Sequence, residues 1–216
     1  MGKLALAVNK DDLLEIPHYK LSEEIYDFLY YPNRVLFLDA TLEPRPECET
    51  NTSLVQLLPY IVLMDKNKRV LSYRRGKAGG EDRLKNKCSI GFGGHVEEGF
   101  DKISLKDRSE MLALSALREL NEELGFELTY SNLLKVKDAF DGRNIQIFYS
   151  TQDEVSRVHL CLLIKIECEP SEINKLEDGV IIEPEWLTLQ ELREKHSNKE
   201  RVLEGWSEIA IFNGFI

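Results

Sequence analysis

The sequence predicts an α/β fold: a three-layered α/β/α sandwich built on a mixed sheet, with a small α/β extension in front of it. From residue 53 onward, apolar runs of strand length alternate with stretches of helical periodicity, and mixed strands with several helices pack as layers. Residues 43–52 are polar and contain two prolines, as linkers and exposed loops do. We therefore expect a main domain over residues 53–216 and an N-terminal extension over residues 1–52.

The N-terminal extension is expected to contain two short strands and one helix. Residues 4–8 and 35–38 are apolar enough for strands, and Ser22 can cap a helix over residues 23–29. About fifty residues bury too little surface to be stable alone. The extension also carries closely spaced aromatic side chains, namely Tyr26, Phe28, Tyr30 and Tyr31. We expect it to dock on the main domain or on a second subunit, most simply in a homodimer.

In the main domain, strands are expected on both sides of one long helix. Residues 54–64 and 69–74 flank a polar turn and predict a hairpin. The long helix covers residues 107–124, and a charged loop with several glycines, residues 76–87, comes before it. The periodicity of the remaining sequence predicts strands near residues 126–138, 144–150 and 157–168, then helices over residues 187–196 and 200–212.

Composition and charge argue against several classes of partner. The 216 residues include 28 basic and 38 acidic side chains, for a net charge of −10, without a concentrated basic tail. This argues against nonspecific binding of nucleic acid or of an anionic membrane. No apolar run approaches the length of a membrane span, and the apolar N-terminal run is too short for a signal peptide. The four cysteines lack metal-site spacing and suit buried free thiols, which indicates the cytoplasm.

Three glutamates on the long helix are the first sign of a metal site. Glu119, Glu122 and Glu123 stand at positions i, i+3 and i+4, so a helix places them on one face. Such carboxylates repel one another unless a cation lies among them, and oxygen ligands suit Mg²⁺ or Mn²⁺. The alternative is an exposed helix surface on which Arg118 simply pairs with Glu122.

A glycine-rich turn upstream of the helix favours the metal site. Residues 91–99 read GFGGHVEEG, and residues 118–126 read RELNEELGF. Together they resemble the Nudix box, in which a glycine and a five-residue spacer lead to a glutamate, and seven further residues lead to an arginine–glutamate motif. Gly94 and the five residues after it match the first half, and residues 118–126 match the second half without a departure.

Ten extra residues, 100–109, separate the two halves of the motif. In the usual pattern the first glutamate follows the spacer directly, whereas this chain has Phe100 and then Asp101 there. Seven residues separate Glu110 from Arg118, as the motif requires. Either Glu110 keeps the role after an insertion, or Asp101 substitutes for it, or neither does. We expect the insertion to bulge outward and to leave the turn at residues 93–94 beside the glutamates.

The resemblance implies a metal-dependent hydrolase, and within the Nudix superfamily the chain is similar to MutT-like phosphoesterases. Such an enzyme cleaves a diphosphate linkage in a nucleoside diphosphate joined to another group. Glu119, Glu122 and Glu123 match the family's ligands for Mg²⁺ or Mn²⁺, with the carbonyl of Gly93 as a further ligand. Arg118 matches the arginine that orients the glutamates. Glu119, Glu122 and Arg118 are therefore expected to serve catalysis, in which bound metal activates a water molecule.

The general base is expected either on the helix or in a loop outside the motif. In the family it is a box glutamate or an acid from such a loop. Glu154 precedes the strand predicted near residues 157–168 and could reach the site, and Asp153 is its rival. A solvated acidic turn is the alternative for both residues.

Basic residues and one histidine are candidates for binding the substrate, a small nucleotide or other diphosphate. Arg74 and Arg75 end a predicted strand and can grip phosphate oxygens. His95 follows the double glycine and is expected near the metal or the phosphate. His159 lies within an apolar strand, where a hydrogen-bonded core histidine is the expectation.

Two other functions are compatible with these motifs. An isomerase similar to the isopentenyl-diphosphate enzymes would use a cysteine near the metal, and Cys88 precedes the glycine turn. A non-catalytic sensor would bind a nucleotide sugar, but such domains commonly lose the box glutamates. Because all three glutamates and Arg118 are present, the sequence favours hydrolysis.

Overall fold

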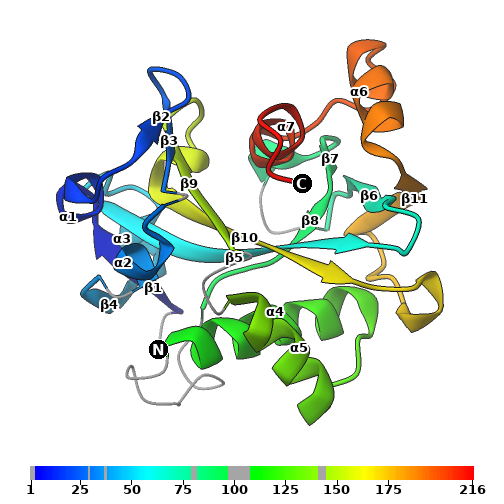
Figure 1. Ribbon diagram of the computed structural model, residues 1–216, viewed down its shortest axis with the longest axis horizontal. Coiled ribbons are helices and arrows are strands. Elements are labelled where there is room, and N and C mark those ends of the chain that lie inside the picture. The colour runs from blue at the N-terminus through cyan, green and yellow to red at the C-terminus, as the bar shows by residue number, and fades with distance from the viewer. Residues whose placement is uncertain (1–2, 29, 37, 79–81, 97–107, 141–144) are drawn as a thin grey trace.

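The computed structural model describes residues 3–28, 30–36, 38–78, 82–96, 108–140 and 145–216. Figure 1 shows one large sheet between two layers of helices. Among the described residues, no helix combines the length and the apolar character needed to cross a bilayer. The predicted α/β/α sandwich is confirmed. Helices α4 (Arg108–Leu124) and α5 (Tyr130–Phe140) cover one face, and α6 (Leu189–Ser197) and α7 (Gly205–Phe212) cover the other.

The sheet is mixed, and its central pair of strands is parallel. β10 (His159–Glu167) runs parallel to β5 (Leu54–Met64), whereas the other paired strands are antiparallel. Over the described residues the sheet has eleven strands, with the main order β11-β6-β5-β10-β9-β3-β2. The other strands are β1 (Leu4–Asn9), β2 (Tyr19–Lys20), β3 (Ile25–Asp27), β4 (Ala40–Pro44), β6 (Val70–Arg75), β7 (Cys88–Ser89), β8 (Gly91–Phe92), β9 (Gln146–Ser150) and β11 (Ile181–Leu187).

The two central strands are buried on both faces. In β5, Leu57 and Ile61 pack in the core that α4 and α5 cover, while Tyr60 and Val62 pack in the core that α7 covers. The side chains of β10 divide between the two cores in the same way. A strand with apolar side chains on both faces is a continuous apolar run in the sequence. Both strands are therefore recognisable without the structure.

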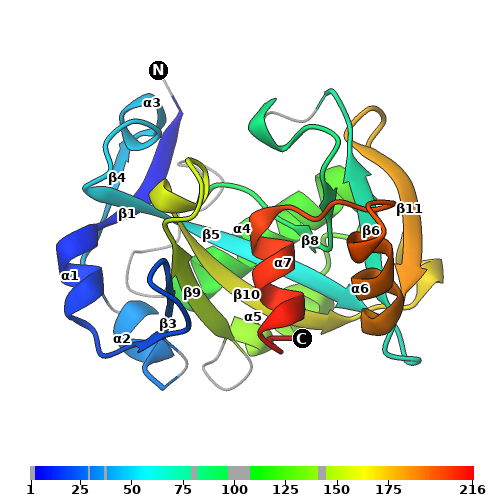
Figure 2. The ribbon, with the colours of Figure 1, turned by 90° about the horizontal axis from the view of Figure 1, so that it is seen from above.

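The N-terminal residues add strands to this same sheet. β1 pairs with β4 and with β5, where Ala7 lies opposite Gln56, and β3 pairs with β9. Figure 2 shows the short helices α1 (Lys10–Glu15), α2 (Pro32–Leu36) and α3 (Arg45–Cys48) gathered at this end of the sheet. The strand expected over residues 4–8 is confirmed, and Phe28 is buried in the main core. The extension thus docks on the main domain, while the boundary at residue 52 stays a prediction.

Three predictions for this extension are wrong. Residues 23–29, predicted as a helix, contain β3, because backbone pairing with β9 outweighs local propensity. Residues 35–38, predicted as a strand, contain the end of α2, which Pro32 starts at its first helical position. Residues 43–52, predicted as a linker, contain the end of β4 and all of α3, whose Cys48 is buried.

Two differences concern the main domain. Residues 126–138, predicted as a strand, mostly form helix α5, in which Val136 and Phe140 lie one turn apart and face the core. β11 escapes the sequence pattern because a register shift between Ile182 and Glu185 breaks its alternation. The predicted hairpin, the long helix, the two strands after it and the two C-terminal helices are confirmed.

The predicted insertion lies mostly outside the described residues. Its first eight residues, including Asp101, fall there, and its last two residues begin α4. Glu110 lies in the first turn of α4, and its carboxylate is 3.1 Å from the Nζ of Lys137 in α5. This contact ties the two helices together.

Candidate active site

Arg118 joins the glutamates of α4 to the loop that follows the glycine turn. Its Nη1 lies 2.8 Å from Oε1 of Glu119 and 3.2 Å from Oε2 of Glu122. Its Nη2 donates a hydrogen bond of 3.0 Å to the carbonyl of His95. Because Arg118 is buried, it does not fit the alternative of an exposed helix pair. The guanidinium fixes two carboxylates and a loop at once.

The glycine turn lies directly against the first of these glutamates. A methyl group on Gly94 would meet Oε1 of Glu119 at 2.3 Å, and one on Gly93 would meet the carbonyl oxygen of Pro59 at 1.9 Å. At Gly93 the obstacle is backbone, so only glycine fits, whereas at Gly94 it is the end of a side chain that would have to move. The expected proximity of the turn to Glu119 is confirmed, so the two halves of the motif form one site.

Glu123 is the buried member of the glutamate cluster. Its burial, together with the neighbouring carboxylate of Glu119, raises the pKa of Glu123 to about 8. Within the part of the chain that the structure describes, its Oε2 has no hydrogen-bond partner. A buried carboxylate oxygen without a partner is unfavourable unless a cation neutralises its charge. With Glu122 half exposed beside it, the cluster fits a hard divalent cation such as Mg²⁺ or Mn²⁺. The carbonyl of Gly93 stays a predicted further ligand.

Arg74 and Arg75 lie at the end of β6 in different surroundings. Arg74 donates from Nε to Glu183 at 2.9 Å and from its other nitrogens to two backbone carbonyls. Burial acts to lower the pKa of Arg75, but electrostatic interactions with Tyr73, Glu204 and Glu123, among others, outweigh it and raise that pKa. Arg75 is therefore the one close to the glutamate cluster. The part of either arginine in substrate binding stays a prediction.

A cleft of about 500 Å³ opens beside the predicted general base. The loop between β6 and β7 and the loop before β10, at the top of Figure 2, both border it. Glu154 is exposed and lines the cleft together with Arg83 and Lys87. Asp153 instead accepts hydrogen bonds from two backbone amides and from the hydroxyl of Ser156, each at 2.8 or 2.9 Å. Asp153 thus stabilises a turn. Residues of α7 line the same cleft, on the face of the sheet opposite the glutamates of α4, so Glu154 as the general base stays a prediction.

A buried hydrogen-bond network holds the strand that enters the glycine turn. Glu204, at the start of α7, accepts hydrogen bonds from Tyr60 at 2.6 Å and from Ser89 at 2.7 Å. The hydroxyl of Tyr73 donates to the carbonyl of Gly91 at 3.0 Å. A side chain on Gly91 would overlap the ring of Tyr60. The backbone leading to Gly93 and Gly94 is therefore fixed from the face that α7 covers.

The cysteines do not support an isomerase. All four are free thiols and buried, as expected. Cys88 packs with Leu203 and Trp206 in the core under α7, whereas the glutamates belong to α4 on the opposite face. Burial raises the pKa of the Cys88 thiol. A thiol in this position does not suit a reaction that needs a cysteine beside the metal.

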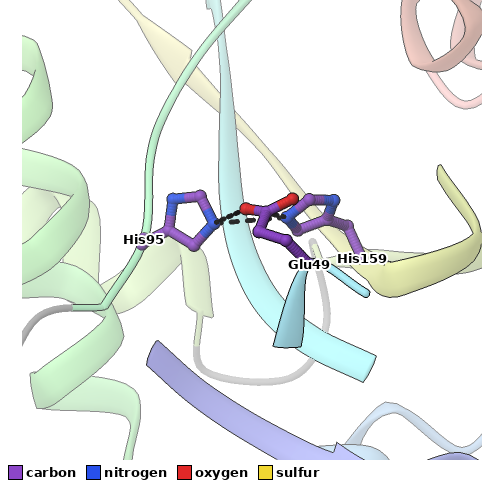
Figure 3. Close-up of side chains that lie close together, drawn as sticks. All are labelled: Glu49, His95 and His159. Atoms are coloured by element: carbon purple, nitrogen blue, oxygen red, sulfur yellow. Dashed lines mark hydrogen bonds and ion pairs between the residues drawn. The ribbon is translucent and has the colours of Figure 1, made fainter. Parts of the chain in front are cut away.

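Figure 3 shows His95 together with two residues from distant parts of the chain, Glu49 and His159. The Nε2 atoms of the two histidines are 3.2 Å apart, and Oε1 of Glu49 lies 3.6 Å from the first and 3.9 Å from the second. His159 is buried, and its Nδ1 donates to the carbonyl of Val155 at 2.7 Å, as expected for a core histidine. Burial, with the positive charge of Arg45 nearby, lowers the pKa of His95 to about 2.

Sequence reasoning misses Glu49 and the contact between the two histidines. Glu49 follows α3 directly, five residues before β5 begins, and His159 is the first residue of β10. The parallel pairing of these strands places His159 opposite Gln56, near the junction of α3 and β5. No local spacing in the sequence announces this arrangement, because it depends on the register of two distant strands.

Known proteins resemble this chain in sequence and in structure. The sequence profile of the NUDIX domain matches residues 59–205. Protein YmaB of Bacillus subtilis (strain 168) is 28% identical over 167 residues, which cover 77% of this chain and 74% of YmaB. The crystal structure of Tm1382, a candidate Nudix hydrolase, covers 98% of both chains with 25% identity and a TM-score of 0.68.

A NUDIX hydrolase from Alicyclobacillus acidocaldarius shares the fold, with 14% identity and a TM-score of 0.50 over 73% of this chain and 89% of its own. The matched domain covers most of the present chain and contains both the glycine turn and the glutamate helix. The chain therefore belongs to the Nudix family, as a hydrolase that acts on pyrophosphate bonds.

Proposed function

We propose that the protein uses Mg²⁺, or Mn²⁺ in its place, to hydrolyse the diphosphate linkage of a nucleoside diphosphate joined to another group. One observation carries the proposal: the glycine turn lies against Glu119, and one carboxylate oxygen of the buried neighbour Glu123 has no hydrogen-bond partner within the described residues. Such a cluster favours a divalent cation, and a diphosphate brings the negative charge that the cation binds.

Glu119, Glu122 and Glu123 would hold the metal, with the carbonyl of Gly93 beside them. When bound, the metal supplies charge neutralisation of the diphosphate and a lowered pKa of a coordinated water. Arg118 is a positioning residue, since its ion pairs keep two of the carboxylates from turning into solvent.

In the reaction itself, a water oxygen attacks one phosphorus, and the bond from that phosphorus to the bridging oxygen breaks. Glu154 at the cleft accepts the proton of the water, with a box glutamate as the alternative base. Arg75 and Arg74 bind the diphosphate oxygens, and His95 is the third predicted contact.

The surroundings of the enzyme follow from charge and thiol chemistry. Because the protein has a net charge of −10 and buried free cysteines, we propose that it is a cytoplasmic enzyme. It would act on small molecules and bind neither nucleic acid nor membrane stably. Tyr19 and Tyr30 are exposed and lie with ring centroids 5.4 Å apart beside the edge strand β2. Such a patch supports the proposed homodimer.

A substrate panel with Mg²⁺ tests the proposal directly. It includes nucleoside triphosphates, dinucleoside polyphosphates, nucleotide sugars and ADP-ribose, with the products identified by chromatography. Glu122→Gln removes one charged ligand and should lower turnover by about a hundredfold or more while the fold survives. Glu127→Gln, an exposed change just beyond α4, is the matched control and should leave turnover unchanged. Wild-type turnover and Mg²⁺ dependence in Glu122→Gln would remove the assignment.

A further inference from the structure

We infer that Glu49, His95 and His159 form a binding site for one zinc-class transition-metal ion, separate from the glutamate cluster of α4. Two imidazole nitrogens and one carboxylate oxygen are a set of ligands with which proteins hold Zn²⁺ and leave a coordination position open. Sites made of carboxylates alone suit Mg²⁺ instead. The inference concerns a second metal and holds whichever diphosphate is the substrate.

The three donor atoms are spaced for a single ion. The two nitrogens and Oε1 of Glu49 form a triangle with sides of 3.2, 3.6 and 3.9 Å. The point in their plane that is equidistant from all three atoms is about 2.1 Å from each, the length of zinc bonds to nitrogen and oxygen; a small inward movement of Glu49 would lift the ion out of this plane into tetrahedral coordination. The carboxylate distances are too long for hydrogen bonds. The three groups therefore converge on a common point without hydrogen-bonding to the carboxylate.

The neighbours of His159 prepare its Nε2 for a metal. Because its Nδ1–H donates to the carbonyl of Val155 at 2.7 Å, a neutral ring keeps its lone pair on Nε2, inside the cluster. Histidines that bind metals usually donate their other ring nitrogen to a backbone carbonyl or a carboxylate. His159 is also buried, so its orientation is fixed by packing.

Gln56 provides a second, independent sign of a missing ligand. Its Nε2 donates a hydrogen bond of 3.1 Å to Nε2 of His159, which an ion would replace, while its buried Oε1 has no hydrogen-bond partner among the residues described. An unpaired buried carbonyl oxygen is unfavourable. A rotation of this amide would turn the oxygen toward the cluster, where an ion or its bound water would satisfy it.

The competing explanation is that Glu49 only anchors two arginines. Nε of Arg45 lies 3.5 Å from Oε1 of Glu49, and Nη2 of Arg83 lies 3.4 Å from Oε2. Both contacts are long for charge-assisted hydrogen bonds, and neither explains why two imidazole nitrogens face the same oxygen. The two explanations differ in whether both histidines and Glu49 bind the same ion.

An ion in this cluster would connect three segments: the end of α3, the loop after Gly94 and the start of β10. It would thus link the N-terminal extension to the turn that contacts Glu119. A substrate oxygen could then occupy the open coordination position of the ion, so that His95 would contact the substrate indirectly.

The test uses the full-length protein after chelator treatment and dialysis. Co²⁺ is titrated because its visible absorption distinguishes tetrahedral from octahedral coordination, and bound Zn²⁺ is counted by elemental analysis. We expect one tightly bound equivalent, a tetrahedral Co²⁺ spectrum and a higher melting temperature with Zn²⁺. Glu49→Gln and His95→Gln should each weaken binding at least tenfold and abolish the tetrahedral spectrum.

Matched controls separate this site from its surroundings. Glu47→Gln is an exposed change of the same charge on α3, and His18→Asn removes a remote imidazole; both should bind like the wild type. Glu122→Gln should keep the tetrahedral spectrum although it disturbs the glutamate cluster. Each metal-free variant is first compared with the wild type in thermal unfolding. If a histidine variant does not fold, the metal binding of Glu49→Gln, which keeps the side-chain volume, tests the inference instead. Absence of a tetrahedral ion in the wild type would overturn the inference. Wild-type affinity for the ion in Glu49→Gln would also overturn it. The same holds if Glu122→Gln loses the ion while the variants of Glu49 and His95 keep it.

Discussion

Replacing Gly94 by alanine tests whether the glycine turn is shaped around the glutamates that we propose as metal ligands. The added methyl group would lie 2.3 Å from Oε1 of Glu119 and 2.5 Å from its Cδ. Ordinary contact between such atoms begins near 3.5 Å, so the carboxylate must move by roughly 1 Å. A displacement of this size at a catalytic site costs about a hundredfold in rate. That factor corresponds to about 2.7 kcal/mol of transition-state stabilisation.

The same substitution at Gly93 should act differently and serves as the comparison. Its methyl group would meet the carbonyl oxygen of Pro59, in the backbone of the central strand β5, at 1.9 Å. The carboxylate of Glu119 can rotate away, but this backbone cannot. Gly93→Ala should therefore lower the stability by about 1–3 kcal/mol or more, while Gly94→Ala should stay within roughly 1 kcal/mol of the wild type.

Two measurements on each variant separate these effects. Initial rates over a range of Mg²⁺ concentrations, with the substrate found in the panel, give kcat/KM and the metal requirement. Thermal unfolding gives the stability. For Gly94→Ala we expect a hundredfold lower kcat/KM, a higher Mg²⁺ requirement and nearly unchanged unfolding. Wild-type kinetics in Gly94→Ala, or equal losses of stability in both variants, would refute the reasoning.

Two further predictions concern stability and assembly. Burial acts to raise the pKa of Asp65, but its hydrogen bonds from Arg69 outweigh burial and lower that pKa. The carboxylate therefore stabilises the fold above roughly pH 4, and this stabilisation is lost as the pH falls further. Asp65→Asn should lower the free energy of unfolding by about 1–3 kcal/mol at neutral pH. Urea unfolding at a series of pH values should also show a smaller loss of stability below roughly pH 4 than in the wild type; an equal loss would contradict this. The full chain should sediment as a dimer, and a chain shortened to begin at Asn51 should be insoluble, because β5 and β9 lose partner strands and the site of Phe28 is empty. A monomeric full chain would contradict the dimer. A soluble and active shortened chain would contradict the need for the N-terminal extension.

The glutamate site is predictable from sequence because its parts are local. Glu119, Glu122 and Glu123 lie within two turns of one helix, so their spacing alone fixes their common face. The contact between Gly94 and Glu119 follows from the resemblance of the two half-motifs to one known motif. The central strands are predictable for a related reason, since burial on both faces leaves a plain apolar run.

The remaining features depend on contacts between distant parts of the chain. β3 is a strand only because β9 offers it a backbone edge. Glu49 and His159 meet only because β5 and β10 pair in one particular register. The segment that forms α5 is short and apolar, so strand and helix are equally compatible with it until the core selects the helical face.

The partnership of β3 with β9 has a consequence for how the protein is made. Ile25 lies opposite Ser150 and Asp27 opposite Phe148, so the pairing strands are separated by about 125 residues of chain, a strongly non-local contact. At ribosomal speeds of roughly 5–20 residues per second, the first hairpin waits on the order of ten seconds for its neighbour. During that interval its open edge and the side chain of Phe28 are available to other nascent chains and to chaperones. A pause in translation before residue 150 would therefore lengthen the time in which the N-terminal hairpin can misassemble.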